Sequence, residues 1–220
     1  KKHIIVTKKI WDKKNFNKIN KKKYKIFNNI NLNKFKKIKP EFIFFIHWSN
    51  FIKKNIYENF KCIQFHCSDL PKFRGGSPIQ NQILKGINKT KITAFRISKK
   101  IDEGDVCKKE IINLNGNVSH ILKRVEKKSI KMILNITNKK SLKFNKQKGK
   151  ISKFKRRTAK DSDITLHKYQ KLRKIYDFIR MVDGDGYPNA YLNLQKYKII
   201  FKNSKFKKNN IIGEFKIQKK

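Results

Sequence analysis

The strongest constraint on the fold of this chain is one short pattern near its middle. An apolar run, Cys62–His66, ends in a histidine, and a proline- and glycine-rich loop follows at once. The run predicts a buried strand, and Ser77–Leu84, with Pro78 in its first turn, predicts a short helix. A histidine at that point lies at the carboxyl edge of a sheet, where open α/β sheets carry their functional groups.

Short apolar runs alternate with helical periodicity along the first two thirds of the chain, which predicts βαβ units and a mainly parallel sheet. The predicted strands are His3–Thr7, Tyr24–Phe27, Glu41–His47, Cys62–His66, Thr90–Ser98 and Val106–Leu114. The predicted helices between and after them are Asn31–Ile38, Asn50–Phe60, Ser77–Leu84 and a long amphipathic helix from Val118 to Ile136. Glu41–His47 is almost wholly apolar, as a strand covered on both faces must be.

Composition predicts a division of the chain after the long helix. Residues 139–155 are rich in lysine, glutamine, glycine and serine and lack periodicity, so we expect a linker or exposed loop there. The expected parts are therefore 1–138, the linker 139–155, and a small α+β or partial-barrel subdomain at 156–220. In that subdomain, a helix around Leu172–Val182 precedes strands at Ala190–Leu194 and Tyr197–Phe201.

The chain is strongly basic, with 58 basic and 15 acidic residues and a formal net charge of +43. Only seven of the basic residues are arginine, and the lysines are spread over the whole length among asparagine, isoleucine and phenylalanine. A dedicated nucleic-acid surface would cluster its charge and favour arginine. We interpret the lysine excess mainly as a coding bias, with weak and salt-sensitive attraction to polyanions as its consequence.

Three cysteines, Cys62, Cys67 and Cys107, form no CxxC pair, so we expect neither a disulfide framework nor a metal site. No run reaches about 18 apolar residues, and the first residues lack the features of a signal peptide. We therefore expect a reduced, cytoplasmic protein with no membrane partner.

The central pattern is similar to that of a known family. Cys62–Gln80 with Lys99–Asp105 resembles the formyltransferases that include methionyl-tRNA formyltransferase and the enzymes that act on nucleotide-linked amino sugars. In that family an Asn-x-His at a strand end is followed by Ser-x-Leu-Pro-x-x-Arg-Gly, a proline, a helix and an Asp-x-Gly-Asp turn. The matching residues are His66, Ser68, Leu70, Pro71, Arg74, Gly75, Pro78, Gln80, Asp102, Gly104 and Asp105.

The resemblance implies a Rossmann-like formyltransferase fold, shortened at its N-terminus, and N10-formyltetrahydrofolate as the formyl donor. It places the donor beside Ser68, Leu70, Pro71, Arg74, Gly75 and Asp102. Formyl transfer to an amine needs a base, and His66 is the candidate, with Asp105 to orient the imidazole. Gln64 stands where the family has asparagine and is the candidate donor to the oxyanion.

Each of these residues has a simpler interpretation. His66 is explained equally by a satisfied core histidine, Asp105 by a turn cap, and Gln64 by an amide that pairs with backbone. Arg74 with its glycines is explained by a tight loop, and Cys67 by packing. The ordered spacing of the whole pattern favours the functional interpretation for His66 and Asp105.

The acceptor is open between two classes. Arg156-Arg157 and Tyr187–Tyr191 resemble the C-terminal part of amino-sugar formyltransferases, which favours a nucleotide-linked amino sugar. The alternative is initiator methionyl-tRNA, which a positive chain would attract. A further alternative is a catalytically weakened relative that binds folate or RNA without turnover.

Overall fold

The computed structural model describes residues 1–169 and 171–220, and these form two compact units. The first unit comprises Lys1–Gly75, Thr90–Ile112 and Lys123–Lys153, and the second comprises Gly76–Lys89, Asn113–Leu122 and Phe154–Lys220. Each unit is thus made of three segments that alternate along the chain, whereas the sequence predicted consecutive parts at 1–138, 139–155 and 156–220. That division stays a prediction.

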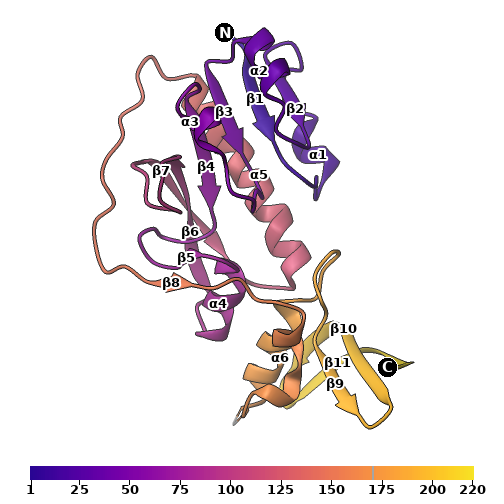
Figure 1. The fold of residues 1–220 in the computed structure, drawn as a ribbon. Coiled ribbons are helices and arrows are strands. Elements are labelled where there is room, and N and C mark those ends of the chain that lie inside the picture. Colours follow the sequence, from indigo (N-terminus) through magenta and orange to yellow (C-terminus); the bar gives the residue numbers. More distant parts are fainter. Residues whose placement is uncertain (170) are drawn as a thin grey trace. The chain divides into compact units, whose positions relative to one another are not determined.

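A six-stranded sheet forms the centre of the first unit, in the order β2-β1-β3-β4-β6-β7 (Figure 1). Its strands are β1 (His3–Val6), β2 (Tyr24–Phe27), β3 (Phe42–Phe45), β4 (Cys62–His66), β6 (Lys89–Arg96) and β7 (Val106–Asn113). The first four run parallel, and β6 pairs with β4 in the antiparallel sense. The predicted mainly parallel, Rossmann-like sheet is confirmed.

One face of this sheet is covered by short helices. The helices of this face are α2 (Leu32–Ile38) and α3 (Lys54–Tyr57), whereas α1 (Lys13–Phe16) bonds through Asn15 to Glu126 of the long helix α5 (Val118–Thr137). Phe35 of α2 and Ile56 of α3 join Ile43 and Phe45 in one buried cluster. Alternate side chains of a strand point to opposite faces, so Cys62, Gln64 and His66 share this face of β4. The face that carries the hydrophobic cluster therefore ends in polar groups at the carboxyl edge.

The α3 helix is shorter than the predicted Asn50–Phe60. Lys53 is extended, with ψ of 151°, and makes no side-chain cap. Ile52 is nonetheless 5% exposed, because the extended segment itself carries it into the core. Burial in an irregular segment produces the same apolar signal as the first turn of a helix, which is why the prediction extended too far.

Figure 1 shows the long helix α5 (Val118–Thr137) running behind the strands of the sheet. Its buried side chains include Met132 and Ile133, as the predicted helical periodicity requires. Glu126 is fully buried, and its carboxylate accepts hydrogen bonds from the backbone N–H groups of Trp11 and Asp12 at 2.8 and 2.9 Å. A buried charge is tolerable only when hydrogen-bonded in this way, so Glu126 fixes the loop after β1.

The second unit contains α4 (Pro78–Leu84), α6 (Leu172–Arg180) and an antiparallel sheet in the order β11-β10-β9. Its strands are β9 (Tyr191–Leu194), β10 (Tyr197–Lys207) and β11 (Asn210–Lys219). Arg180, 1% exposed, donates to the Asp177 carboxylate at 2.6 Å and to the Gly116 carbonyl at 2.8 Å. The predicted small subdomain is confirmed as helix plus sheet. Among the described residues, no helix has the length and apolar character needed to cross a membrane.

His3 on β1 provides a test of the core. It is fully buried and lies against Tyr24, with ring centroids 5.3 Å apart. Burial lowers the pKa of His3 to about 4, although Glu41 acts in the opposite direction. The unfolded chain binds this proton near pH 6.5, so the folded state loses stability as pH falls from there towards 4. We expect a loss of about 2 kcal/mol between pH 7 and pH 5.

Urea unfolding at the two pH values measures this loss, with His3→Phe as the matched variant. The variant should lose clearly less stability on acidification than the wild type. Equal losses in both proteins would contradict the assignment to His3.

Candidate active site

His66 is the last residue of β4 and is 7% exposed. Its Nε2 lies 2.7 Å from the Phe73 carbonyl oxygen, and its Nδ1 lies 3.4 Å from Oδ2 of Asp102. Carbonyl and carboxylate oxygens only accept hydrogen bonds, so both ring nitrogens face acceptors. A neutral imidazole can donate to one of them, whereas the doubly protonated ring can donate to both. Contacts to both ring nitrogens therefore fix the position of the His66 imidazole at the end of β4.

The loop after His66 is folded by its own polar groups. Ser68 Oγ donates to the Lys72 carbonyl at 2.6 Å, and the Ser68 carbonyl accepts from Thr93 Oγ1 at 2.6 Å. Thr93 Oγ1 in turn accepts from the backbone N–H of Leu70 at 3.3 Å. Ser68 and Leu70 are fully buried, and the Leu70–Pro71 peptide bond is cis. These residues, predicted to contact a cofactor, give the loop its shape.

Asp102 lies in the turn between β6 and β7 and is 6% exposed. Its Oδ2 accepts the Gly75 backbone N–H at 2.8 Å, in addition to facing His66. Gly104 makes the turn tight, since a Cβ there would lie 1.6 Å from the Arg96 carbonyl oxygen. The turn, the loop and the strand end thus meet at one carboxylate.

The structure does not place the Asp105 carboxylate beside His66. Its half-buried carboxylate makes no hydrogen bond or ion pair with any described residue, and its backbone carbonyl accepts the Arg96 N–H at 2.8 Å. The carboxylate beside His66 is that of Asp102, which the resemblance assigns to cofactor binding. The tight turn at Gly104 separates the two carboxylates, and spacing alone does not show which of them faces the strand end.

Gln64 precedes His66 on the same face of β4 and is half-buried. Its Nε2 donates to the Trp48 carbonyl at 3.2 Å. A side-chain amide has two N–H donors, so this bond engages one of them. The structure therefore pairs Gln64 with backbone, and its expected role towards an oxyanion stays a prediction.

Arg74 is 6% exposed and belongs to β5 (Arg74–Gly75), which pairs with β8 (Lys153–Phe154). Its Nη2 donates to Gln147 Oε1 at 2.8 Å, and its Nη1 lies 3.1 Å from Glu103. Gly75 has φ of 91°, a conformation that glycine adopts without strain. Arg74 is thus held by protein groups, and Gly75 leaves the loop backbone without a side chain.

Gln147 contacts both site loops and Ser152 contacts the loop after β4, and the sequence did not indicate either residue. Both lie in the segment predicted to be a linker or exposed loop. Ser152 Oγ accepts the Phe73 N–H at 2.9 Å, and the Ser152 carbonyl accepts the Arg74 N–H at 2.8 Å. A single glutamine or serine in a lysine-rich stretch has no spacing signal by which it could be found.

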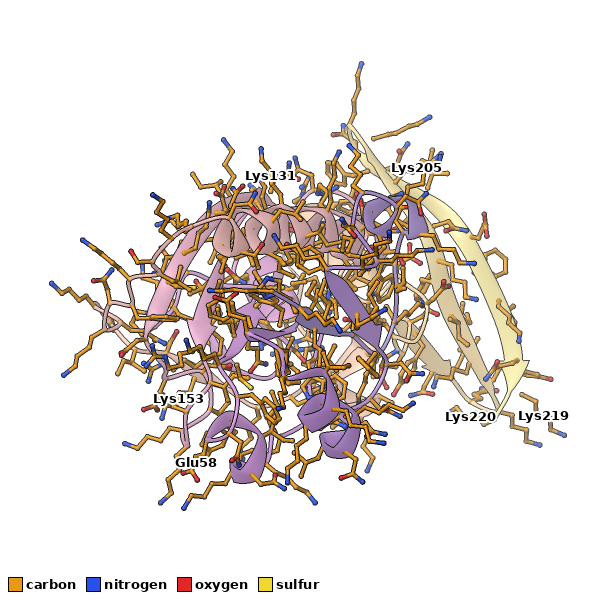
Figure 2. The ribbon with its side chains drawn as sticks, turned by 90° about the horizontal axis from the view of Figure 1, so that it is seen from above. Glu58, Lys131, Lys153, Lys205, Lys219 and Lys220 are labelled. Atoms are coloured by element: carbon orange, nitrogen blue, oxygen red, sulfur yellow. The ribbon has the colours of Figure 1, made fainter. Side chains whose placement is uncertain are left out.

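In the second unit, Arg157 is turned towards protein groups. Its guanidinium donates to the Asp161 carbonyl and lies 5.7 Å from the Phe178 ring centroid. Burial lowers the pKa of Arg157, which indicates a partly desolvated side chain. By contrast, Figure 2 shows lysines such as Lys131 and Lys205 extending outward from their elements. This distribution is the one expected of a diffuse lysine excess.

Two family models match the chain. One, described as formyl transferase, covers residues 4–137 and so includes every residue from His66 to Asp105. The chain belongs to the formyl transferase family. The second, described as the C-terminal domain of methionyl-tRNA formyltransferase, covers residues 159–218.

Relatives of this formyl transferase are found among solved and curated proteins. The structure of methionyl-tRNA formyltransferase from Clostridium thermocellum is 40% identical, has a TM-score of 0.92 and is matched over 100% of this chain and 99% of its own. The methionyl-tRNA formyltransferase of Campylobacter fetus is 35% identical over 108 residues, 49% of this chain and 36% of that protein. The chain thus spans about a third of the length of the curated relatives it matches. A 4-N formyltransferase from Francisella tularensis shares the fold, with TM-score 0.67 and 18% identity over 97% of this chain and 96% of its own.

The part of the formyl transferase that the structure describes contains no group of three or more histidine, cysteine or acidic residues placed to hold a metal ion. The polar groups at the end of β4 comprise the imidazole of His66, the carboxylate of Asp102 and the amide of Gln64.

Cys67, next to His66, provides a test of this environment. Burial, with a contribution from Asp102, raises the pKa of the Cys67 thiol to about 12. Burial likewise raises the pKa of Cys62 to about 12 and that of Cys107 to about 11. Because the thiolate is the reactive form, we expect none of the three to react quickly with Ellman's reagent at pH 8 in the folded protein.

Absorbance at 412 nm measures the released thiolate, and addition of urea should expose all three thiols as the positive control. Rapid labelling of Cys67 in a folded Cys62→Ala, Cys107→Ala double variant would contradict its assignment to packing.

Proposed function

We propose that this protein transfers a formyl group from N10-formyltetrahydrofolate to the amino group of methionyl-tRNA. The observation that carries the proposal is the 40% identity to a methionyl-tRNA formyltransferase over the whole of this chain. It is supported by a buried imidazole–carboxylate pair at the end of a parallel strand, a place where open sheets bind ligands.

His66 is the proposed proton acceptor. The acceptor amine would form a bond to the formyl carbon of the bound donor, and the bond from that carbon to the donor nitrogen would then break, with the donor nitrogen leaving with the proton that the base has taken from the amine. The amine must lose a proton in this step. For His66 Nε2 to take it, the ring must exchange its contact with the Phe73 carbonyl for the amine. Asp102, 3.4 Å from Nδ1, then stabilises the imidazolium that results.

Gln64 is the proposed donor to the oxyanion that forms on the formyl oxygen. One amide N–H is bonded to the Trp48 carbonyl, which fixes the plane of the side chain. The second N–H is available for a developing negative charge at the same face of β4. A pre-oriented donor of this kind stabilises the transition state without reorganisation.

The loop Ser68–Gly75 and Asp102 are the proposed contacts of the folate. Ser68, Leu70 and Arg74 are buried and held by protein partners, so we assign them to shaping the loop. Gly75 has no side chain, so its backbone permits close approach by a planar ligand. The folate is thus proposed to bind where the resemblance places it, with most of its direct contacts made by the backbone of this loop.

The choice of methionyl-tRNA over an amino sugar is based on identity and on Arg157. The 4-N formyltransferase from Francisella tularensis is only 18% identical, which supports the fold alone. Arg157, one of the residues that resemble the C-terminal part of amino-sugar formyltransferases, is turned to Asp161 and Phe178. A net charge of +43 favours a polyanionic acceptor, with binding that weakens as salt rises.

Mass spectrometry of products tests this function. The pure protein is incubated with N10-formyltetrahydrofolate and either methionyl-tRNA or a panel of nucleotide-linked amino sugars. Formylation of methionyl-tRNA is the expected result. Formylation of a sugar alone would replace the proposed acceptor, and no product in any mixture, with folate still bound, would support a binding-only relative.

Two aspartate variants distinguish the assignments within the turn. Asp102→Asn should lower kcat by about 10²–10⁴-fold, since the amide cannot stabilise the imidazolium. Asp105→Asn is the matched control, removes the same charge, and should leave kcat within about threefold. Steady-state kinetics with methionyl-tRNA measures both, and circular dichroism confirms folding. A larger loss in Asp105→Asn would restore Asp105 as the orienting group.

A further inference from the structure

The chain after α5 returns to the candidate active site. Asn145 exchanges two backbone hydrogen bonds with Val106, at 2.8 and 2.9 Å, where β7 begins. The Ser152 N–H donates to the Pro71 carbonyl at 3.3 Å, and Lys153 pairs with Glu103 at 3.0 Å. We call residues 144–153 the strap. It is attached to both the loop after β4 and the turn that carries Asp102.

Gln147 is the residue of the strap that reaches the catalytic turn. Its Nε2 donates to the carbonyls of Asp102 and Gly104, each at 2.9 Å. Its Oε1 accepts from Arg74 Nη2 at 2.8 Å and from Arg74 Nε at 3.2 Å. The two carbonyls can only accept and the guanidinium can only donate, so these partners fix the orientation of the amide. Every donor of the side chain is satisfied.

The turn needs this support because of its backbone conformation. Asp102 has φ of 55°, in the left-handed region. That region is unfavourable for a residue with a side chain, and it persists only where neighbouring groups hold it. Gln147 holds the turn from the carbonyl side, at Asp102 and Gly104. The Gly75 N–H holds the carboxylate of the same residue at 2.8 Å.

The two contacts are joined through Arg74. The residue that bonds Gln147 Oε1 immediately precedes Gly75, whose N–H bonds Asp102. Gln147 therefore bonds to both segments that meet in the contact between Gly75 and Asp102. The orientation of His66 depends on that contact. It touches neither ring nitrogen itself, and it has no place in the proposed proton transfer.

We propose that Gln147 is a positioning residue for the formyl transfer, acting through Asp102 on His66. The inference rests on the proposed function for its kinetic consequence, although the positioning itself does not depend on turnover. Without the amide, the left-handed turn relaxes and the Asp102 carboxylate leaves His66 Nδ1. Small displacements of a group that orients a base reduce the chemical step more than substrate binding.

The test compares three variants of the full chain. Gln147→Glu keeps the size of the side chain and its acceptor for Arg74, but places a carboxylate against two carbonyl oxygens. Gln147→Ala removes both sets of contacts. Lys148→Ala alters the exposed neighbour and lowers the net charge by one, as Gln147→Glu does. It is therefore the matched control for charge and for a change in the strap.

Steady-state kinetics with N10-formyltetrahydrofolate and methionyl-tRNA is the first measurement. We expect kcat to fall by about 10–100-fold in both Gln147 variants, with KM within about threefold of the wild type. Lys148→Ala should match the wild type in both constants. A folded Gln147→Glu protein with wild-type kcat, or a rise in KM alone, would overturn the inference.

Histidine NMR is the second measurement and needs no turnover. The ring signal of His66 in protein labelled at histidine Cε1 is assigned by its absence in His66→Gln. It should shift in Gln147→Glu and stay in place in Lys148→Ala. A wild type without activity would refute the proposed function, while a shifted His66 signal would still support the positioning role. An unmoved signal would refute that role whatever the activity.

Discussion

A single carboxylate oxygen joins the parts of this site. Asp102 Oδ2 accepts the Gly75 N–H at 2.8 Å and faces His66 Nδ1 at 3.4 Å. Hydrogen bonds to a charged group contribute about 1.5–3 kcal/mol each, more than neutral ones. Through this atom the end of β4, the loop that follows it and the turn between β6 and β7 are fixed together. The side chains at the carboxyl edge then have one arrangement.

The parallel strands could be predicted because their burial dominates their composition. The residues Ile43, Phe44 and Phe45 of β3 are fully buried, and a short, uninterrupted apolar run is typical of a strand covered on both faces. The last strand, β11 (Asn210–Lys219), could not be predicted in the same way. Phe215 and Ile217 are 67% and 55% exposed and alternate with the polar residues Glu214, Lys216 and Gln218. A strand that buries little leaves little pattern in the sequence.

The site residue that directly follows a recognisable strand could be predicted from the sequence. The site residues that are identified only by contacts between distant segments could not. His66 is found at a strand end, so its position could be read from the run before it. The choice between Asp102 and Asp105 depends on how one turn closes at Gly104, which residue spacing does not determine. Gln147 is 45 residues from Asp102, and its amide is identified as part of the site only by that contact.

The strap differs from an ordinary surface connection because its length is constrained by the site. Surface connections usually tolerate insertion and deletion, because their ends are all that the fold requires. Here the connection is bonded at Asn145 to the start of β7, at Gln147 to the turn that carries Asp102, and at Ser152 to the loop after β4. Its length is set by the distances between those attachments. The number of residues between α5 and β8 is therefore constrained by the site, although the composition of this segment is that of a linker.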